Sequence, residues 1–397
     1  MKSEGSTRQS EAMVSATQRL QEVGELRARE ARAPTYAELR PFGPRETSGF
    51  PVYKNLEQRL LRAEAHPDPV IAHVMATCSA YAYAGPETVS MIMARLGLED
   101  NQCRMIQMSV DPMLLRSTAF VIQSKSGRAA VLCYRGTEPL SLINWMVNLD
   151  VDPEQIGYEV GGPCPTVHGG FYRNTRATRY EVMNTLKRAC ERRSVRVSEF
   201  DGAHGMMDGP LEALYITGHS LGGALAGLMA VMMRHERKYR EVFADRLKAV
   251  YTFGQPMIGN PDFVAACQRD AFLREKVIRY VYGEDMVPHL PPATSGPFQH
   301  FGREYRYRTS SFRSSLMGLL GRFGVDHQQL PVVWEESTAP SSQMSGVPAI
   351  LLANLAFVAG RFQVPHPLPA AHSVEHHFPR HYIASLTPAG VSNEFGD

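Results

Sequence analysis

Near the middle of the chain, a serine lies between glycines directly after an apolar run. The residues are Gly218-His219-Ser220-Leu221-Gly222, preceded by the run 214–217. A serine hydroxyl becomes a nucleophile for carbonyl carbon when a neighbouring base accepts its proton. The five residues alone indicate this chemistry only weakly, because a serine also suits an ordinary tight turn.

The segments on both sides of Ser220 predict a strand, a sharp turn and a helix. The run 214–217 is apolar, and the small residues of 223–230 are typical of a buried helix. A nucleophile elbow of this kind strains the serine backbone and makes its hydroxyl project from the sheet. Gly218 and Gly222 are then required, because larger side chains would collide with the strand and the helix.

A polar turn after the apolar run 129–134 could supply a donor to a developing oxyanion. Backbone amides suit this role in acyl transfer. One is expected from Leu221, directly after the nucleophile, and another from the loop after an earlier strand. Thr137 lies in such a loop, although an ordinary turn at residues 135–137 is an equal alternative on spacing alone.

The segment after this turn has an apolar helical face. Its members are Leu140, Ile143, Met146 and Val147, with Trp145 among them. Such a helix could be a lid that presents its apolar face to a lipid surface. Composition alone favours the alternative, a core helix in which Trp145 is buried.

Together these motifs resemble the class 3 lipases, typified by the fungal triacylglycerol lipases, over roughly residues 70–390. The blocks that carry the resemblance are Tyr134-Arg135-Gly136-Thr137 with Asn144-Trp145, Val167-His168-Gly169-Gly170-Phe171, Gly218-His219-Ser220-Leu221-Gly222-Gly223, Tyr251-Thr252-Phe253-Gly254-Gln255-Pro256 with Gly259-Asn260, and Asp285-Met286-Val287-Pro288-His289-Leu290-Pro291-Pro292. The set is far more specific than any one block.

The resemblance implies an α/β-hydrolase fold, with a mostly parallel central sheet, helices on both faces and a lid helix after the oxyanion loop. It also implies a Ser–His–Asp triad that acts on lipid esters at an interface, with Thr137 at the lid hinge. The expected lid residues are Leu140, Ile143, Trp145 and Met146. Asn148 departs from the family, which often has Asp after the Trp, but this difference does not touch the chemistry.

Asp285 is expected to be the acidic member of the triad. It follows the predicted strand 277–282 at the carboxyl end, where open α/β sheets gather their site residues. Its role would be to hold the histidine tautomer and to stabilise the imidazolium. Its neighbour Glu284 is the rival, and the family pattern favours Asp285.

The histidine is the least constrained member of the triad. It should follow the aspartate along the chain, and the histidines that do so are His289, His300, His327, His366, His372, His376, His377 and His381. By family resemblance, His289 and His300 are structural, and the base lies a few residues before a tyrosine of the last helix. His377 fits best, and His372 and His376 remain alternatives.

The elements that must position these residues alternate along the chain. Strand candidates are 118–123, 129–134, 214–217, 249–253 and 277–282, and helical candidates include 174–192 and 222–236. This alternation predicts a mostly parallel sheet covered on both faces.

The chain divides into an N-terminal helical extension and connector, residues 1–66, and a catalytic domain, residues 67–397. An insertion at about 308–365 holds two apolar segments. They indicate extra core helices, or a cap that binds acyl chains or faces a membrane.

Composition excludes several classes of partner. The formal net charge of +2 gives no electrostatic reason to expect nucleic acid. The six cysteines lack close spacing, so a metal site is not expected, and a Ser–His–Asp triad needs no metal or organic cofactor. Without a signal peptide or an apolar run of about 20 residues, the default location is cytoplasmic, with signal-independent export or membrane-surface contact left open. The sequence does not indicate the oligomeric state.

The sequence therefore predicts a carboxylic ester hydrolase of the triacylglycerol lipase type, which acts on lipid or acylglycerol through an acyl-enzyme. A phospholipase A1, or an esterase for short or aromatic esters, is the alternative within catalysis. An inactive hydrolase fold that binds lipid or a partner protein is the alternative of another class. That fold would lack a triad member, whereas candidates for all three are present.

Overall fold

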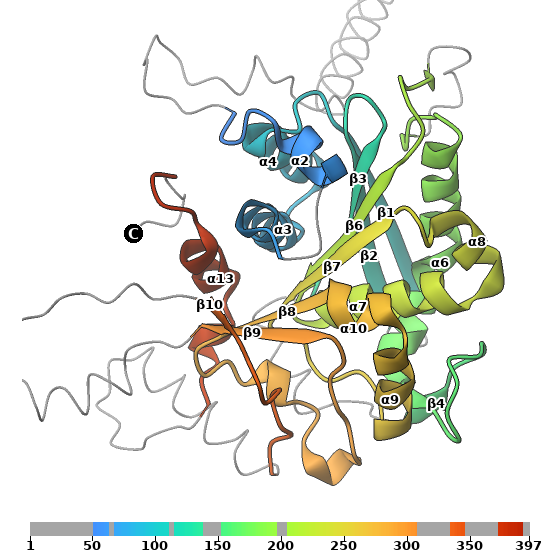
Figure 1. The fold of residues 1–397 in the computed structure, drawn as a ribbon, viewed down its shortest axis with the longest axis vertical. Coiled ribbons are helices and arrows are strands. Elements are labelled where there is room, and N and C mark those ends of the chain that lie inside the picture. The colour runs from blue at the N-terminus through green and yellow to red at the C-terminus, as the bar shows by residue number, and fades with distance from the viewer. Residues whose placement is uncertain are drawn as a thin grey trace, which may run out of the picture. The chain divides into compact units, whose positions relative to one another are not determined.

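A central sheet of eight strands organises the part of the chain that the structure describes (Figure 1). The computed structural model describes residues 51–62, 67–110, 115–137, 152–196, 205–307, 334–345 and 372–391, all within one unit, Gly49–Asp397. The strands of the central sheet are β1 (Gln102–Val110), β2 (Leu115–Gln123), β3 (Ala129–Tyr134), β6 (Ala213–His219), β7 (Leu247–Phe253), β8 (Val277–Tyr282), β9 (Arg303–Tyr307) and β10 (Trp334–Glu336). A separate pair is formed by β4 (Pro153–Gln155) and β5 (Thr166–His168).

The middle of the central sheet is parallel and its two ends are antiparallel. The strand order is β1-β2-β3-β6-β7-β8-β9-β10. Neighbours from β3 to β9 run parallel, whereas β1, β2 and β3 pair antiparallel, as do β9 and β10. The carboxyl ends of the parallel strands therefore meet at one edge, where α/β sheets gather their site residues. This is the mostly parallel sheet of the α/β-hydrolase fold that the sequence predicts.

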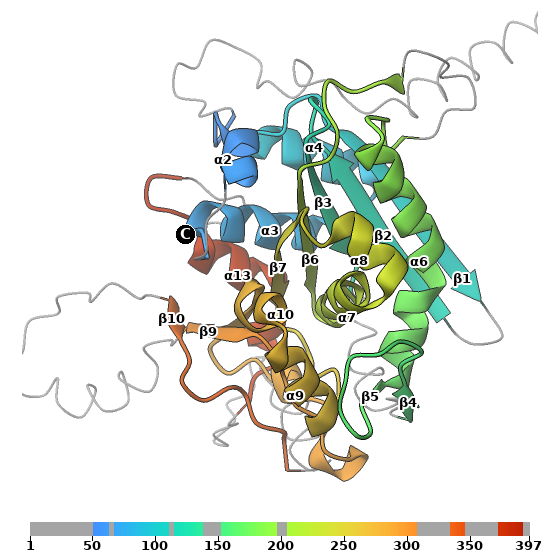
Figure 2. The same cartoon turned by 45° about the vertical axis from the view of Figure 1, so that its right-hand side comes forward.

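Helices cover both faces of the sheet. One face carries α2 (Leu56–Arg62), α3 (Pro69–Tyr81), α4 (Pro86–Leu96) and α13 (Pro379–Leu386). The other carries α6 (Gly169–Cys190), α7 (Leu221–His235), α8 (Arg237–Phe243), α9 (Pro261–Arg269) and α10 (Ala271–Lys276). Figure 2 shows α13 beside α3, so the last described helix lies against the first long one. The short 3-10 helices are η4 (Val287–His289), η5 (Ala293–Ser295) and η7 (Glu375–His377).

The strand β3 contributes to two hydrophobic cores. Ala130, Leu132 and Tyr134 pack with the α6–α7 side, whereas the alternate residues of β3 pack with the α3–α4 side. Side chains of a strand alternate between faces, so a strand covered on both is apolar at every position. Both β3 at 129–134 and β8 at 277–282 therefore begin and end where the apolar runs of the sequence predict.

Residues 51–62 pack into the core instead of forming a connector. Leu56 and Leu60 are buried. The Tyr215 hydroxyl donates a hydrogen bond to the Leu60 carbonyl oxygen at 2.8 Å. Residues 51–62 belong to the unit Gly49–Asp397, and they lie within the range 1–66 for which the sequence predicts an extension and connector. Two buried leucines one helical turn apart form too short a pattern to stand out in the sequence.

Several expectations fall outside the described residues. They concern most of the N-terminal extension, the lid residues Leu140, Ile143, Trp145 and Met146, and most of the insertion at 308–365. Among the residues that are described, no helix combines the length and the apolar character needed to cross a membrane.

Candidate active site

Ser220 lies in the turn between β6 and α7, in a backbone conformation that few side chains adopt. Its φ is 59° and its ψ is −131°. Two main-chain hydrogen bonds hold the turn, because Ser220 N–H donates to the Phe253 carbonyl and Gly223 N–H donates to the Ser220 carbonyl, each at 2.9 Å. The Ser220 side chain is buried. The strand, turn and helix expected around this serine are all present.

Close backbone contacts explain the two glycines of the elbow. A Cβ at Gly218 would lie 2.3 Å from the carbonyl oxygen of Gly222. A Cβ at Gly222 would lie 2.3 Å from the carbonyl oxygen of Tyr134, at the end of β3. Both distances are far shorter than van der Waals contact, so only glycine allows α7 to pack this closely against the sheet.

The loop after β3 lies against the elbow. β3 and β6 run parallel, and Tyr134 lies opposite Gly218. A Cβ at Gly136 would lie 2.5 Å from the His219 carbonyl oxygen and 3.3 Å from Cβ of Ser220. The loop expected to supply an oxyanion donor is therefore adjacent to the serine.

Thr137 and Leu221, the two residues expected to donate to the oxyanion, each directly follow a residue of the contact between this loop and the elbow. Thr137 comes after Gly136 and is partly exposed. Leu221 comes after Ser220 and is the first residue of α7. Amides at a helix N-terminus have no partner within the helix and favour negative charge.

Asp285 and His377 are in direct contact, although 92 positions separate them. Asp285 follows β8 and forms a parallel bridge with Ser373, which brings the following η7 helix to the aspartate. His377 Nδ1 lies 3.0 Å from Oδ1 and 2.9 Å from Oδ2 of Asp285. Both side chains are buried.

The surroundings of Asp285 favour its ionised form. Val287 N–H donates to Oδ1 at 2.9 Å, and the Tyr382 hydroxyl donates to Oδ2. Burial alone would raise the pKa of Asp285, but the charge of His377 and the hydrogen bonds hold that pKa below its ordinary value. A carboxylate only accepts hydrogen bonds, so the contact requires the proton of His377 to lie on Nδ1. Its Nε2 is then free to accept a proton.

Ser220 Oγ and His377 Nε2 are among the buried side-chain atoms that have no hydrogen-bond partner among the described residues. Unpaired buried polar atoms are rare in folded proteins and require an explanation, such as a catalytic role. A serine, a histidine with a free Nε2 and a carboxylate on Nδ1 form a set that can activate the serine hydroxyl.

The rival histidines have other partners. His376 Nδ1 accepts a hydrogen bond from the Glu284 main-chain N–H at 3.0 Å. The His372 ring lies beside His289, with the ring centroids 4.5 Å apart. Among the described residues, His377 is the histidine that contacts the Asp285 carboxylate.

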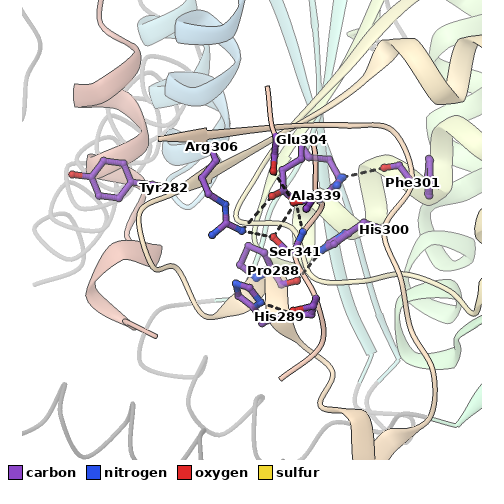
Figure 3. Close-up of polar contacts among 12 residues, drawn as sticks. Tyr282, Pro288, His289, His300, Phe301, Glu304, Arg306, Ala339 and Ser341 are labelled. Carbon is purple, nitrogen blue, oxygen red and sulfur yellow. Dashed lines mark hydrogen bonds and ion pairs between the residues drawn. The ribbon is translucent and has the colours of Figure 1, made fainter. Parts of the chain in front are cut away.

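His289 and His300 belong to a buried polar cluster (Figure 3). His289 Nδ1 donates to the Ser342 carbonyl at 2.6 Å, and His300 Nε2 donates to the Pro288 carbonyl at 2.8 Å. These bonds hold neighbouring loops together, which is a structural role.

Sequence reasoning missed three residues that touch the site. Tyr382 donates to Asp285, Tyr83 contacts His219, and Gly254 has a φ of 57° beside Asp285 and His377. In the sequence, Tyr382 is the tyrosine that marks the last helix, and nothing there points to a contact with Asp285. A glycine directly after a buried strand is the one signal that could have indicated Gly254, because that position suits a positive φ.

The described residues contain no group of three or more histidine, cysteine, aspartate or glutamate side chains that could hold a metal ion.

The chain is similar to known lipases. The model of a family described as Lipase (class 3) matches residues 131–295. A triacylglycerol lipase of Ricinus communis is 32% identical over 220 residues, which cover 49% of this chain and 40% of that protein. A phospholipase A1 of Oryza sativa is 29% identical over 180 residues, 41% of this chain and 40% of that protein. The chain thus spans about 40% of the length of these relatives. A solved structure of Rhizomucor miehei triacylglyceride lipase is 25% identical, covers 61% of this chain and 80% of its own, and has a TM-score of 0.45.

Proposed function

The chain belongs to the class 3 lipase family, and we propose from this membership that it hydrolyses carboxylic esters of lipids. Ser220 is the nucleophile, His377 the general base and Asp285 the residue that orients the base. The observation that carries the proposal is the buried Asp285–His377 pair, at 2.9 Å, on the edge of the sheet where Ser220 occupies a strained turn.

In the proposed reaction, Ser220 Oγ attacks the ester carbonyl carbon while His377 Nε2 accepts the hydroxyl proton. Amides of Leu221 and Thr137 donate to the tetrahedral oxyanion. The imidazolium that His377 forms is stabilised by the Asp285 carboxylate and then donates its proton to the departing alcohol. Water, deprotonated by the same histidine, hydrolyses the acyl-enzyme and restores the serine.

We infer that the substrate is an acylglycerol presented at a lipid surface. The triacylglycerol lipase of Ricinus communis supports this substrate class. The apolar segment with Leu140, Ile143, Trp145 and Met146 supports a lid that contacts lipid, as the sequence predicts. Hydrolysis of emulsified triacylglycerols, measured against short soluble esters, tests the inference. Activity restricted to short soluble esters would reject it and favour an esterase.

A phospholipase A1 is the second candidate, because the rice relative bears that name. Both reactions use the same triad and differ in the group attached to the glycerol. Diacyl phospholipids and triacylglycerols with the same acyl chains, compared by kcat/KM, separate the two. Release of the sn-1 acyl chain from phospholipid, at a higher kcat/KM than triacylglycerol, would favour the phospholipase.

Replacement of Ser220 by alanine tests the proposal as a whole. Ser220→Ala should abolish hydrolysis of every ester that the wild type cleaves, with an unchanged melting temperature. Hydrolysis by Ser220→Ala near the wild-type rate would reject the nucleophile. A wild type that cleaves no ester and binds lipid would support the inactive hydrolase fold instead.

A further inference from the structure

His219, the residue before the nucleophile, has a hydrogen-bond partner on each ring nitrogen. The Tyr83 hydroxyl lies 3.0 Å from Nδ1, and the main-chain oxygen of His377 lies 2.7 Å from Nε2. A carbonyl oxygen can only accept, so Nε2 carries the ring proton. Nδ1 is then an acceptor, and Tyr83 must donate to it. The two bonds define one tautomer of His219.

The environment of His219 keeps the ring neutral. Burial, followed by the charge of His377, lowers the pKa of His219 to about 3. The ring therefore carries one proton across the range in which esterases are assayed, and its bond to the His377 carbonyl persists there.

The ring of His219 also contacts the ring of His377. Their centroids are 4.5 Å apart with an angle of 35° between the planes. His377 is thus held at three points: Nδ1 by Asp285, the carbonyl oxygen by His219 Nε2, and one side of the ring by the His219 ring.

Tyr83 joins this arrangement to the loop after β3. A Cβ at Gly136 would lie 2.3 Å from the Tyr83 hydroxyl oxygen, so that oxygen packs directly on the loop. The same hydroxyl donates to His219. One tyrosine therefore contacts both the loop that precedes Thr137 and the histidine that holds the base.

We propose that Tyr83 and His219 are positioning residues, which set the direction of His377 Nε2 toward Ser220 through the main-chain carbonyl of His377. The inference rests on the proposed esterase function. Neither side chain takes part in proton transfer. Their effect is on kcat, because a base displaced by about 1 Å can cost on the order of 100-fold in rate.

Two substitutions of His219 distinguish the positioning of His377 from a contribution of His219 to packing alone. Glutamine can place an amide N–H where His219 Nε2 lies, whereas the shorter asparagine reaches only the position of Nδ1. We expect His219→Asn to lower kcat about 10- to 100-fold, with KM unchanged, and His219→Gln to restore most of the wild-type kcat. Tyr83→Phe should lower kcat less than His219→Asn, because the bond to the His377 carbonyl survives.

A second tyrosine–histidine pair serves as the matched control. Tyr53 hydroxyl lies 2.9 Å from His73 Nδ1, and the ring centroids are 6.0 Å apart, against 6.1 Å for Tyr83 and His219. His73 Nε2 faces Thr387 instead of a triad residue, at 3.4 Å. Both histidines are buried. His73→Asn should therefore lower the melting temperature as His219→Asn does, but leave kcat unchanged.

The experiment measures kcat and KM on a soluble ester, the melting temperature, and the low-field proton NMR signal of His377 Nδ1–H, for wild type and all four variants. The expected result is a kcat loss and a broadened signal in His219→Asn, recovery of both in His219→Gln, and neither change in His73→Asn. Wild-type kcat in His219→Asn, or an equal loss in His219→Gln, would overturn the inference while the esterase function stands. A wild type that cleaves no ester would overturn the proposed function and the inference with it.

Discussion

The carboxylate of Asp285 is the charge on which the proposed base depends. Asp285→Asn keeps the shape of the side chain but removes the charge, and the amide can present a donor to His377 Nδ1. The wrong tautomer is then favoured, and kcat should fall by about 10⁴-fold. The measurement is kcat on a soluble ester. The neighbouring exposed residue provides the control, because Glu284→Gln should retain wild-type kcat. A large loss in Glu284→Gln with a small loss in Asp285→Asn would contradict the assignment.

Gly254 is the second position at which a single residue controls the site. It has a φ of 57°, and a Cβ there would lie 2.7 Å from Asp285 Oδ2 and 2.8 Å from His377 Nδ1. Gly254→Ala should therefore displace the Asp285–His377 pair and reduce kcat by about 100-fold.

Gly390 provides a control that separates the effect of backbone strain from the effect of displacing the Asp285–His377 pair. Its φ is 82°, and a Cβ there would meet nothing within 4 Å. Gly390→Ala should cost about 1 kcal/mol of stability from the positive φ and leave kcat unchanged. Equal kcat values for the two alanine variants would show that the contact of Gly254 with the pair has no catalytic importance.

Among single residues, the sequence indicates Ser220 and Asp285 more clearly than the histidine. Each of the first two follows an apolar strand, and strand ends can be recognised from composition. His377 follows a long segment without such a marker, and two other candidates lie within five positions of it. The pairing of Tyr83 with His219 spans 136 positions and has no local signal at all.

At the scale of elements, a buried ion pair fastens the segment 334–345 to β8 and β9. We call Arg279, Glu304, Arg306 and Ser341 the Glu304 cluster. Figure 3 labels Glu304, Arg306 and Ser341 of this cluster. Arg279 Nη1 lies 3.1 Å from Glu304 Oε2, and both side chains are 1% exposed. The N–H and hydroxyl of Ser341 donate to the same carboxylate at 2.9 Å. Glu304 therefore joins two strands and the following segment.

Removal of the Glu304 charge should be costly, because Arg279 would stay buried without its partner. Glu304→Gln is expected to lower the free energy of unfolding by about 3–5 kcal/mol. The exposed pair Arg128–Glu212, at 2.7 Å, is the control, and Glu212→Gln should cost about 1 kcal/mol or less. Urea unfolding of both variants measures the difference. A similar small cost in both would contradict the role of the cluster.

The same cluster predicts how stability depends on pH. Burial alone would raise the pKa of Glu304, but the charges of Arg279, His300 and Arg306 and the Ser341 amide lower it from 4.5 to about 2. Because the folded pKa lies below the unfolded one, this stabilisation is complete above pH 4.5 and is lost as pH falls toward 2. The stability difference between wild type and Glu304→Gln should therefore shrink in that window. A constant difference would contradict the mechanism.

Which elements could be predicted depended on their burial. β3 and β8 are covered on both faces and appear as continuous apolar runs. β1 was not predicted, because it is an edge strand with polar residues such as Arg104 and the exposed Gln107. β10 has only three residues, which is too short for a periodic pattern.

For the whole molecule, the unit Gly49–Asp397 holds both cores and all three proposed triad residues. Deletion of residues 1–48 should therefore preserve the melting temperature and kcat on soluble esters. Residues 51–62 provide the contrast, since Leu56 and Leu60 are in the core. A further deletion through residue 62 should abolish cooperative unfolding. Loss of folding on deletion of 1–48 alone would place the start of the unit earlier.

At this largest scale, alternating strands and helices were sufficient to predict the sheet and its two covered faces. The short helix α2 was not predicted, because its buried residues Leu56 and Leu60 form too short a pattern in the sequence. The lid stays a prediction, since its residues lie outside the described part of the chain.

Ser220 is the proposed nucleophile of an esterase. Labelling of the intact chain with a fluorophosphonate, followed by peptide mass spectrometry, tests it most directly. We expect one phosphonyl group per chain, located on Ser220, with loss of ester hydrolysis in proportion to labelling. A folded chain that stays unlabelled, or a label on another residue that removes activity while Ser220 is unmodified, would contradict it.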